Sequence, residues 1–259
     1  HSIYEDNYYF PLFWKCKSKS VGTVHLDITG VYNPLRKFVL NKVLRKLDFI
    51  VVLSNEQKEK MENLGYKCAF IPHGFSKPVF SVVDLGELPV PFDESKINVF
   101  FSGNTYRDLD MLEVVIKNMQ PKKNIVFHVL SQKGDNKTRF IKYKNAVVYD
   151  RVDDDVYFSL LSKCDYNFLP LTFATANNTL LEAQFLGKTS ILPRIGGIMD
   201  YASTANLFYT SLEDLLHIFK KMTKNDISET ILKDSGKYDW KNVYQQLETE
   251  YKSIISEVE

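Results

Sequence analysis

TFATANNTLLEAQFLGKTSILPRIGGIMD, residues 172–200, contains the pattern that decides the fold. It predicts a loop, a helix from about 177 to 185, a short buried strand and a Gly-Gly turn. Asn177 and Asn178 are favoured residues at the start of a helix. Backbone N–H groups at such a start have no partner within the helix, so they provide a site for an anion.

A single carboxylate lies one turn further along this predicted helix. Glu182 is the only charged residue between Thr172 and Lys188. An anion site with a carboxylate one turn below suits a nucleoside diphosphate, because phosphates need donors and ribose hydroxyls need an acceptor. The alternative interpretation is a core helix whose Glu182 points to solvent at its edge.

The same stretch resembles the donor-binding segment of the retaining, GT-B-fold glycosyltransferases of family 4. In that family a Glu-x7-Glu pattern ends in LLEA and is followed by a G-K/L-P-V-I segment, a GG pair and an acidic residue. The residues that match here are Leu180, Leu181, Glu182, Ala183, Gly187, Lys188, Ile191, Gly196, Gly197 and Asp200. The first Glu of the pattern is absent, and Ala174 stands in its place.

Composition limits the class of protein. The chain has 259 residues with 44% hydrophobic and 25% charged residues, as expected of a globular domain or two. Its net charge of +1 favours no nucleic acid partner. Three cysteines without metal spacing predict reduced thiols and a cytoplasmic location. No apolar run is long enough to span a membrane, and no signal peptide is visible.

The N-terminal part predicts parallel-sheet structure that starts in the middle of a domain. Strands are expected at 21–25 and 49–53, and Ser54 is expected to cap a helix with Gln57. Val24-His25, Val52-Leu53-Ser54 and Ile71-Pro72-His73-Gly74 resemble the second half of the family's N-terminal domain. Because the family's first strands and Gly-rich loop do not precede His1, we expect an incomplete domain: a fragment, or an enzyme completed by a missing segment or a partner chain.

A second series of strands and helices predicts another parallel sheet with helices on both faces. The final segment, from Trp240 onwards, predicts a helix that resembles the family's closing helix, which crosses back onto the N-terminal domain. The expected fold is therefore α/β of GT-B type, with two Rossmann-like domains of which the first is incomplete. The expected divisions are 1–78 for the N-terminal domain, 79–95 for the linker, 96–235 for the nucleotide-sugar domain and 236–259 for the closing helix.

The resemblance implies a role for each candidate site residue. Glu182 would bind the ribose hydroxyls, and the backbone amides of Asn177, Asn178 and Thr179 would meet the distal phosphate. For these three residues, ordinary helix capping is a compatible interpretation. His25 would contact the donor sugar near its reacting centre, although a lone histidine at a strand end is also a common structural residue.

A second part of the expected site follows the strand at 97–101. Gly103 and Asn104 begin a loop in which family members carry an Arg, and here Arg107 is the nearest cation. The resemblance implies that Arg107 stabilises the departing diphosphate; the alternative is a surface arginine. Lys188 or Lys133 could assist Arg107, although neither has a motif match in the family for this role. The remaining histidines at 73, 128 and 217 are expected to be structural.

Ala174 replaces a residue that contacts sugar hydroxyls in the family, and a methyl group cannot accept those hydrogen bonds. Three explanations stand side by side: an unusual donor sugar, replacement by Asn177 or Asn178, or a domain that binds nucleotide but transfers poorly.

The expected function is metal-independent transfer of a hexose from a nucleoside diphosphate sugar to a hydroxyl acceptor, with retention. No metal and no cofactor are expected, because Asp153, Asp154 and Asp155 stand where a helix begins and suit capping instead. A non-catalytic sugar-nucleotide-binding subunit and a GT-B sugar-nucleotide epimerase are the alternatives. The acceptor would be a glycan or a lipid-linked molecule. The basic helix expected at 35–47 offers peripheral membrane contact or, more commonly, a charged solvent face.

Overall fold

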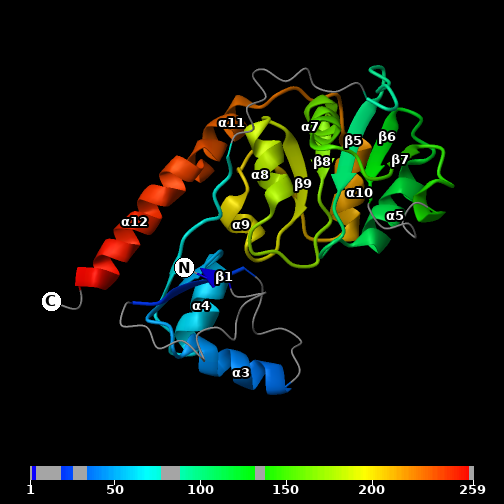
Figure 1. Ribbon diagram of the computed structural model, residues 1–259. Helices are drawn as coiled ribbons and strands as arrows, with labels where there is room; N and C mark the ends of the chain where they lie inside the picture. The colour runs from blue at the N-terminus through cyan, green and yellow to red at the C-terminus, as the bar shows by residue number, and fades with distance from the viewer. Residues whose placement is uncertain (1, 4–18, 26–33, 77–87, 132–137, 257–259) are drawn as a thin grey trace.

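The chain forms two parallel β-sheets, each covered by helices (Figure 1). This computed structural model describes residues 2–3, 19–25, 34–76, 88–131 and 138–256. The N-terminal sheet has four strands in the order β1-β2-β3-β4, all parallel. Its elements are β1 Ser2–Ile3, β2 Val21–Val24, α3 Pro34–Leu44, β3 Phe49–Val52, α4 Asn55–Asn63 and β4 Cys68–Phe70.

The C-terminal sheet has six parallel strands in the order β10-β9-β8-β5-β6-β7. The strands are β5 Ile97–Ser102, β6 Ile125–Leu130, β7 Ala146–Tyr149, β8 Tyr166–Phe168, β9 Thr189–Pro193 and β10 Leu207–Tyr209. The helices are α5 Leu109–Met119, α7 Asp154–Lys163, α8 Asn178–Phe185, α9 Ile198–Tyr201, α10 Leu212–Lys221, α11 Glu229–Ser235 and α12 Trp240–Ser256, with a 3₁₀ turn at Gly236–Tyr238.

This strand order is that of a doubly wound sheet, and its direction reverses between β5 and β8. Connections from neighbouring strands leave in opposite directions at such a point, so a crevice opens beyond the carboxyl ends of the two strands. The loops after β5 and β8 are therefore the ones that the topology brings together.

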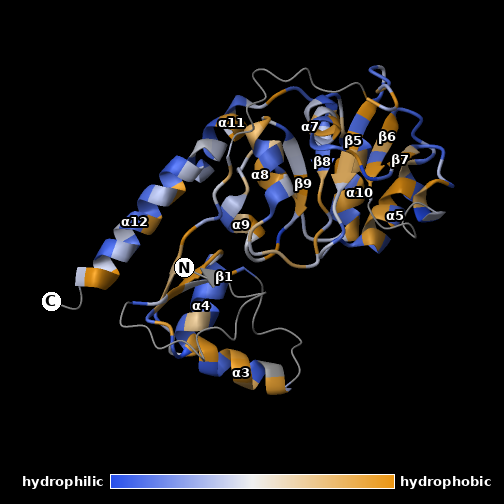
Figure 2. Ribbon diagram, viewed as in Figure 1, coloured by the Kyte–Doolittle hydropathy of each residue, from blue (hydrophilic) through white to orange (hydrophobic). Residues whose placement is uncertain are grey.

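Alternation along β5 explains why helices cover both faces of the C-terminal sheet. Val99 and Phe101 pack against α5 and α10, whereas Phe100 packs against α7 and α8. All three side chains are fully buried. Figure 2 shows the consequence, with hydrophobic residues concentrated along the strands and on the inner sides of α5 and α10. The largely apolar segment at 97–101, interrupted by the buried Asn98, is thus typical of a strand buried on both faces.

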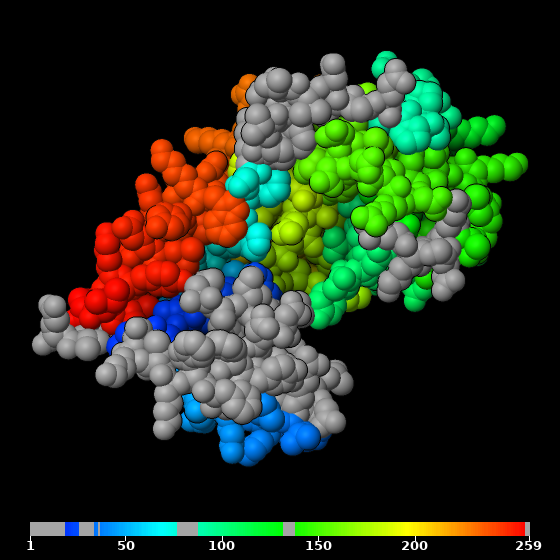
Figure 3. Space-filling model, viewed as in Figure 1, coloured from blue at the N-terminus to red at the C-terminus, as the bar shows by residue number. Residues whose placement is uncertain are grey.

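The closing helix α12 contacts the N-terminal sheet. Val243 is fully buried in a cluster with Val51 and Ile71, and Leu247 packs against the same cluster. In the space-filling view the red C-terminal helix lies directly against blue N-terminal residues (Figure 3). The crossing back that the sequence predicts is confirmed. The spacing of Trp240, Tyr244, Leu247 and Tyr251 predicts one apolar stripe on this helix, but the stripe is narrower, since Tyr244 is 65% exposed.

Helix α3 differs from the predicted helix at 35–47. It ends at Leu44, because Lys46 N and Leu47 N donate to carbonyls three residues back and turn the chain towards β3. The helical spacing of Leu35, Phe38, Val39 and Val43 predicts one buried apolar face, but Leu35 and Phe38 are 71% and 56% exposed. The core side of α3 is formed instead by Leu40, Val43 and Leu44. No helix among the described residues is long and apolar enough to cross a membrane.

The carboxyl edges of the two sheets face each other, and Tyr201 joins them. Its hydroxyl donates to Leu53 O at 2.8 Å and accepts from His73 N at 2.9 Å. Leu53 follows β3 and His73 follows β4, so one side chain from α9 satisfies backbone groups beyond two N-terminal strands. Tyr201 is only 1% exposed. Burial raises the pKa of its hydroxyl, which stays protonated and able to donate.

Asp200 makes a second connection between the domains. Its carboxylate accepts from Asn55 N at 2.8 Å and from Asn55 Nδ2 at 2.7 Å. Asn55 is the first residue of α4, whose start attracts negative charge. The neighbouring cap has the predicted residues: Ser54 Oγ accepts from Gln57 N, and Gln57 Oε1 accepts from Leu53 N.

Candidate functional site

A pocket of about 330 Å³ lies at the point where the C-terminal sheet reverses direction. It is lined by residues 103–107 from the loop after β5, and by residues 173–179 from the loop after β8 and the start of α8. Six of the predicted site residues line it: Gly103, Asn104, Arg107, Asn177, Asn178 and Thr179. Glu182 and His25 lie outside this lining.

Arg107 folds back over Gly103 and spans the gap between the two loops. Its Nε donates to Ser102 O at 3.0 Å, and its Nη2 lies 3.5 Å from Thr179 Oγ1. Gly103 has a φ of 96°, and a Cβ there would lie 3.0 Å from Arg107 Nη2. The positive φ favours a glycine at this position, and a Cβ would also crowd the Arg107 guanidinium. Burial lowers the pKa of Arg107 to about 10, so the guanidinium remains charged at neutral pH.

The start of α8 is capped by the residue that the sequence indicates. Asn177 Oδ1 accepts from Leu180 N at 3.0 Å, and Asn177 is 8% exposed. Its side chain is thus engaged in capping, while Asn178 is exposed at the pocket. The positive end of the α8 dipole faces the pocket together with the Arg107 guanidinium.

Asn104 connects this loop to the next strand. Its Oδ1 accepts from Ser131 Oγ at 3.0 Å, and Ser131 directly follows β6. The loop after β5 is therefore held from both sides, by Ser131 and by Thr179.

Glu182 is not the solvated edge residue of the alternative interpretation. It is partly buried, and its Oε2 accepts a hydrogen bond from the Tyr157 hydroxyl. Burial raises the pKa of the Glu182 carboxyl, whereas the Tyr157 hydrogen bond and the charge of Arg107 act in the opposite direction. Burial likewise raises the pKa of Tyr157, which keeps its proton. The result is a carboxylate fixed in place one turn below the pocket.

His25 reaches the site from the other domain. It directly follows β2, and its backbone carbonyl accepts a hydrogen bond from Thr175 Oγ1. Thr175 lines the pocket. The His25 ring lies edge-on to His73, with ring centroids 6.2 Å apart.

Ala174 lines the pocket, but its methyl group cannot make the polar contact that the family pattern would give this position. It is 7% exposed and belongs to an apolar cluster with Leu180, Leu192 and Ile198. Its carbonyl accepts from Gly197 N at 3.2 Å. A Cβ at Gly197 would lie 2.7 Å from that carbonyl, so the Gly-Gly turn packs closely beneath the pocket loop. Asn177, one of the two residues proposed to replace the missing carboxylate, already uses its Oδ1 to cap α8.

His128 and His73 have contacts of a structural kind. His128 is buried between Tyr149 Oη and Asn98 Oδ1, both at 2.9 Å, and burial lowers its pKa to about 3. His73 packs between His25 and Trp240, and burial lowers its pKa. His217 lies exposed on α10.

Of the two auxiliary lysines, Lys188 does not line the pocket. Lys188 precedes β9, at the opposite end of that strand from the pocket, and Lys133 lies outside the described residues. Asp153 is the N-cap residue of α7, but it makes no side-chain capping hydrogen bond, so the acidic run there acts through charge in the first turn. Within the described part of the chain, no three His, Cys, Asp or Glu residues are grouped to hold a metal.

Three site residues escaped prediction from the sequence. Tyr157 lies on α7, far along the chain from Glu182, and nothing in its local pattern distinguishes it from a core aromatic. Tyr106 has a φ of 54° in the loop beside Arg107, and no feature of the neighbouring sequence predicts this backbone conformation for a tyrosine. Thr175 had a detectable signal, since it is a polar residue within the alanine-rich segment before α8.

Comparison with known proteins rests on structure alone, because no family model and no curated protein matches the sequence. Sucrose-phosphate synthase from Thermosynechococcus elongatus matches with a TM-score of 0.68 over 91% of this chain at 12% identity. Trehalose-6-phosphate synthase OtsA matches with a TM-score of 0.71 over 90% of this chain at 11% identity. The pneumococcal O-GlcNAc transferase GtfA, in complex with UDP and GlcNAc, matches with a TM-score of 0.65 over 92% of this chain at 11% identity.

These similarities establish the fold. The chain is an α/β protein of GT-B type, as the sequence predicts, with two parallel-sheet domains. It spans 68%, 66% and 53% of the length of those three structures.

Proposed function

We propose that this chain belongs to a glycosyltransferase that transfers a hexose from a nucleoside diphosphate sugar to a hydroxyl acceptor, with retention and without a metal ion. One observation carries the proposal: the start of α8, the Arg107 guanidinium and the Glu182 carboxylate lie together at the point where the sheet reverses. The ligand that needs donors, a cation and an adjacent carboxylate is a nucleotide with a diphosphate.

The diphosphate would bind at the start of α8. The amides of Asn178 and Thr179 belong to the first turn, where backbone donors and the helix dipole favour an anion. Arg107 remains charged near neutral pH and lies within reach of Thr179. Negative charge that grows on a leaving diphosphate would be stabilised by these fixed groups.

The ribose would bind at Glu182, whose carboxylate Tyr157 already orients. The sugar would then lie towards residues 173–175 and His25, where the N-terminal domain closes on the pocket. The structure of GtfA with UDP and GlcNAc shows that a protein of similar fold binds such a ligand.

We propose a glycan or lipid-linked acceptor that approaches along the N-terminal domain. Helix α3 exposes Leu35 and Phe38 beside Lys37 and Lys42. An apolar edge with flanking lysines is the composition of a helix that contacts an anionic membrane surface.

Calorimetry with UDP, GDP and ADP in EDTA tests the donor site. We expect one of these nucleotides to bind without divalent metal; failure of all three to bind would exclude the donor-site model. Incubation with a panel of nucleotide sugars then distinguishes the functions. Transfer or slow hydrolysis supports a transferase, and an isomerised donor identifies an epimerase.

Ala174 favours one alternative, a subunit that binds sugar nucleotides without transferring the sugar. A buried methyl stands where a carboxylate contacts the sugar in the resembling family, so a polar contact to the sugar is lost there. Binding without turnover of any donor would decide for this alternative.

A further inference from the structure

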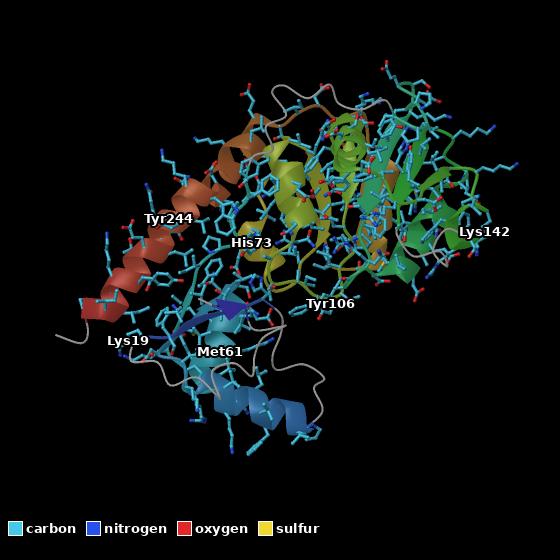
Figure 4. All side chains as sticks on the ribbon, viewed as in Figure 1. Lys19, Met61, His73, Tyr106, Lys142 and Tyr244 are labelled. Atoms are coloured by element: carbon cyan, nitrogen blue, oxygen red, sulfur yellow. The ribbon has the colours of Figure 1, made fainter. Side chains whose placement is uncertain are left out.

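One wall of the pocket consists of two aromatic side chains, Tyr106 and Phe173. Their rings meet edge to face, with centroids 5.1 Å apart and an angle of 69° between planes. Tyr106 is 42% exposed, and both residues line the pocket. Figure 4 labels Tyr106 at the edge of the C-terminal domain that faces the N-terminal domain. The pair is called the aromatic wall below.

The backbone holds the aromatic wall firmly. Thr172 N donates to Tyr106 O at 3.0 Å, and Asp108 N donates to Pro170 O at 2.7 Å. Arg107 and Leu171 form an antiparallel bridge between these two bonds. The loops after β5 and β8 therefore pair as a short ribbon, and each contributes one aromatic residue at its tip.

Tyr106 has a backbone conformation that is unfavourable for its residue type. Its φ of 54° lies in the left-handed region, and it is the only residue other than glycine with a positive φ among those described. Such strain persists where surrounding contacts enforce it, and it is concentrated at ligand sites. Here the paired loops enforce it, and the result is an exposed ring at the rim of a pocket.

The aromatic wall lines the pocket, whereas the carboxylate proposed for the ribose does not. Glu182 does not line this pocket, and it lies one turn inside α8. Phe173 precedes α8 by a short loop. A nucleotide whose ribose meets Glu182 and whose diphosphate meets the start of α8 would extend its far end towards Tyr106 and Phe173.

The pocket lining near the aromatic wall combines apolar and polar groups. Phe173, Tyr106 and Ala176 offer carbon surface, whereas Asn178 and Arg107 offer polar groups across the pocket. A hexose ring has the same division, with C–H groups on its faces and hydroxyls at its edge. An aromatic ring provides a large, rigid apolar surface for such a face.

We propose that Tyr106 and Phe173 form the subsite for the hexose of the donor, and that it is recognised by contact with its ring face. This inference rests on the proposed function and specifies how this chain holds the sugar although Ala174 supplies no polar contact.

Calorimetry on matched variants tests the subsite. UDP, GDP and ADP are compared with UDP-glucose, UDP-GlcNAc, GDP-mannose and ADP-glucose for the wild type, Tyr106→Ala, Tyr106→Phe and Phe173→Ala. Tyr244→Ala is the control, since Tyr244 is an exposed aromatic on α12, away from the pocket (Figure 4). We expect Tyr106→Ala and Phe173→Ala to weaken binding of the nucleotide sugar by about two- to tenfold. Binding of the free nucleotide should stay unchanged, and Tyr106→Phe and Tyr244→Ala should behave as wild type.

Each other result has a distinct meaning. Equal losses for nucleotide and nucleotide sugar, or no loss for either, overturn the hexose subsite. An unchanged donor affinity with a raised KM for the acceptor overturns it as well and assigns the wall to the acceptor. Wild-type protein that binds no nucleotide overturns the proposed function and this inference with it, whereas the first two results leave the proposed function standing. Circular dichroism and thermal unfolding of every variant confirm that folding is intact.

Discussion

The Tyr157 hydroxyl donates a hydrogen bond to Glu182 Oε2, which joins α7 to α8 directly below the pocket. The Tyr157 ring also packs edge-on against Phe100 in the sheet, with centroids 5.8 Å apart. The carboxylate is thereby connected to the rigid core rather than to a loop. A carboxylate held in this way binds hydroxyls without first losing rotamer freedom.

Glu182→Gln should weaken nucleotide binding by about tenfold or more, because hydrogen bonds to a charged group contribute about 1.5–3 kcal/mol. Calorimetry with the nucleotide that binds wild type measures the loss. Glu213→Gln, an exposed change on α10, is the matched control. Wild-type affinity in Glu182→Gln would remove Glu182 from the site.

Tyr157→Phe should make nucleotide binding more sensitive to acid. Burial raises the pKa of the Glu182 carboxyl, so this group takes up a proton at a higher pH in the folded protein than in the unfolded chain. The protonated carboxyl binds ribose hydroxyls less well than the carboxylate does, so nucleotide binding should decline as pH falls. The Tyr157 hydrogen bond opposes that shift, as does Arg107, whereas Asp154 adds to it. Removing the hydroxyl therefore raises the pKa further, and the pH below which binding declines should move upwards.

Affinity measured from pH 4 to pH 8 for wild type and Tyr157→Phe checks this expectation, with Tyr244→Phe as control. Identical pH profiles would mean that Tyr157 does not position Glu182. In the double variant with Glu182→Gln the effect of Tyr157→Phe on the pH profile should vanish, since the titrating group is gone.

Tyr201→Phe should destabilise the protein by about 1–3 kcal/mol, because Leu53 O and His73 N both lose a buried partner. Urea unfolding measures the change. Tyr238→Phe is the comparison, since it removes a single bond from the Tyr238 hydroxyl to Asp200 O, and its effect should be smaller. An effect of Tyr201→Phe no larger than that of Tyr238→Phe would argue against the two-bond connection.

Ala174→Glu should destabilise the fold by several kcal/mol rather than restore a sugar contact, because it places a carboxylate in an apolar cluster. Burial would raise the pKa of that new carboxyl, so the loss of stability should grow as pH rises and shrink as pH falls. Thr172→Glu, two residues away on the exposed side, should be nearly neutral. A folded Ala174→Glu protein with altered donor preference would show instead that the side chain reaches the pocket.

Local patterns predicted the elements of the C-terminal domain well. The boundaries of α8 follow from Asn177, whose side chain caps the first turn, and from Gly187, whose φ of 66° ends the helix. The strand at 125–130 and the helix at 154–163 occur where hydrophobic periodicity and acidic first turns place them. These features depend on interactions between residues a few positions apart, so a single sequence contains them.

The same patterns were insufficient where exposure depends on distant partners. Leu35 and Phe38 have the spacing of core residues, yet the described N-terminal core is filled by Leu40, Val43 and Leu44. Tyr244 has the spacing of an apolar stripe on α12, yet it is 65% exposed, whereas Val243 and Leu247 pack against the N-terminal sheet.

The sequence by itself determined the α/β class, the capped start of α8 with Glu182 one turn inside it, and the glycines at 103 and 197. Only the tertiary structure decided that Arg107 lies against Thr179, that Tyr157 holds Glu182, and that Ala174 is buried in an apolar cluster. The physical reason is the strand order. Placing β5 beside β8 brings together loops about seventy residues apart, and that pairing reflects the packing of the whole sheet rather than the preferences of any one segment.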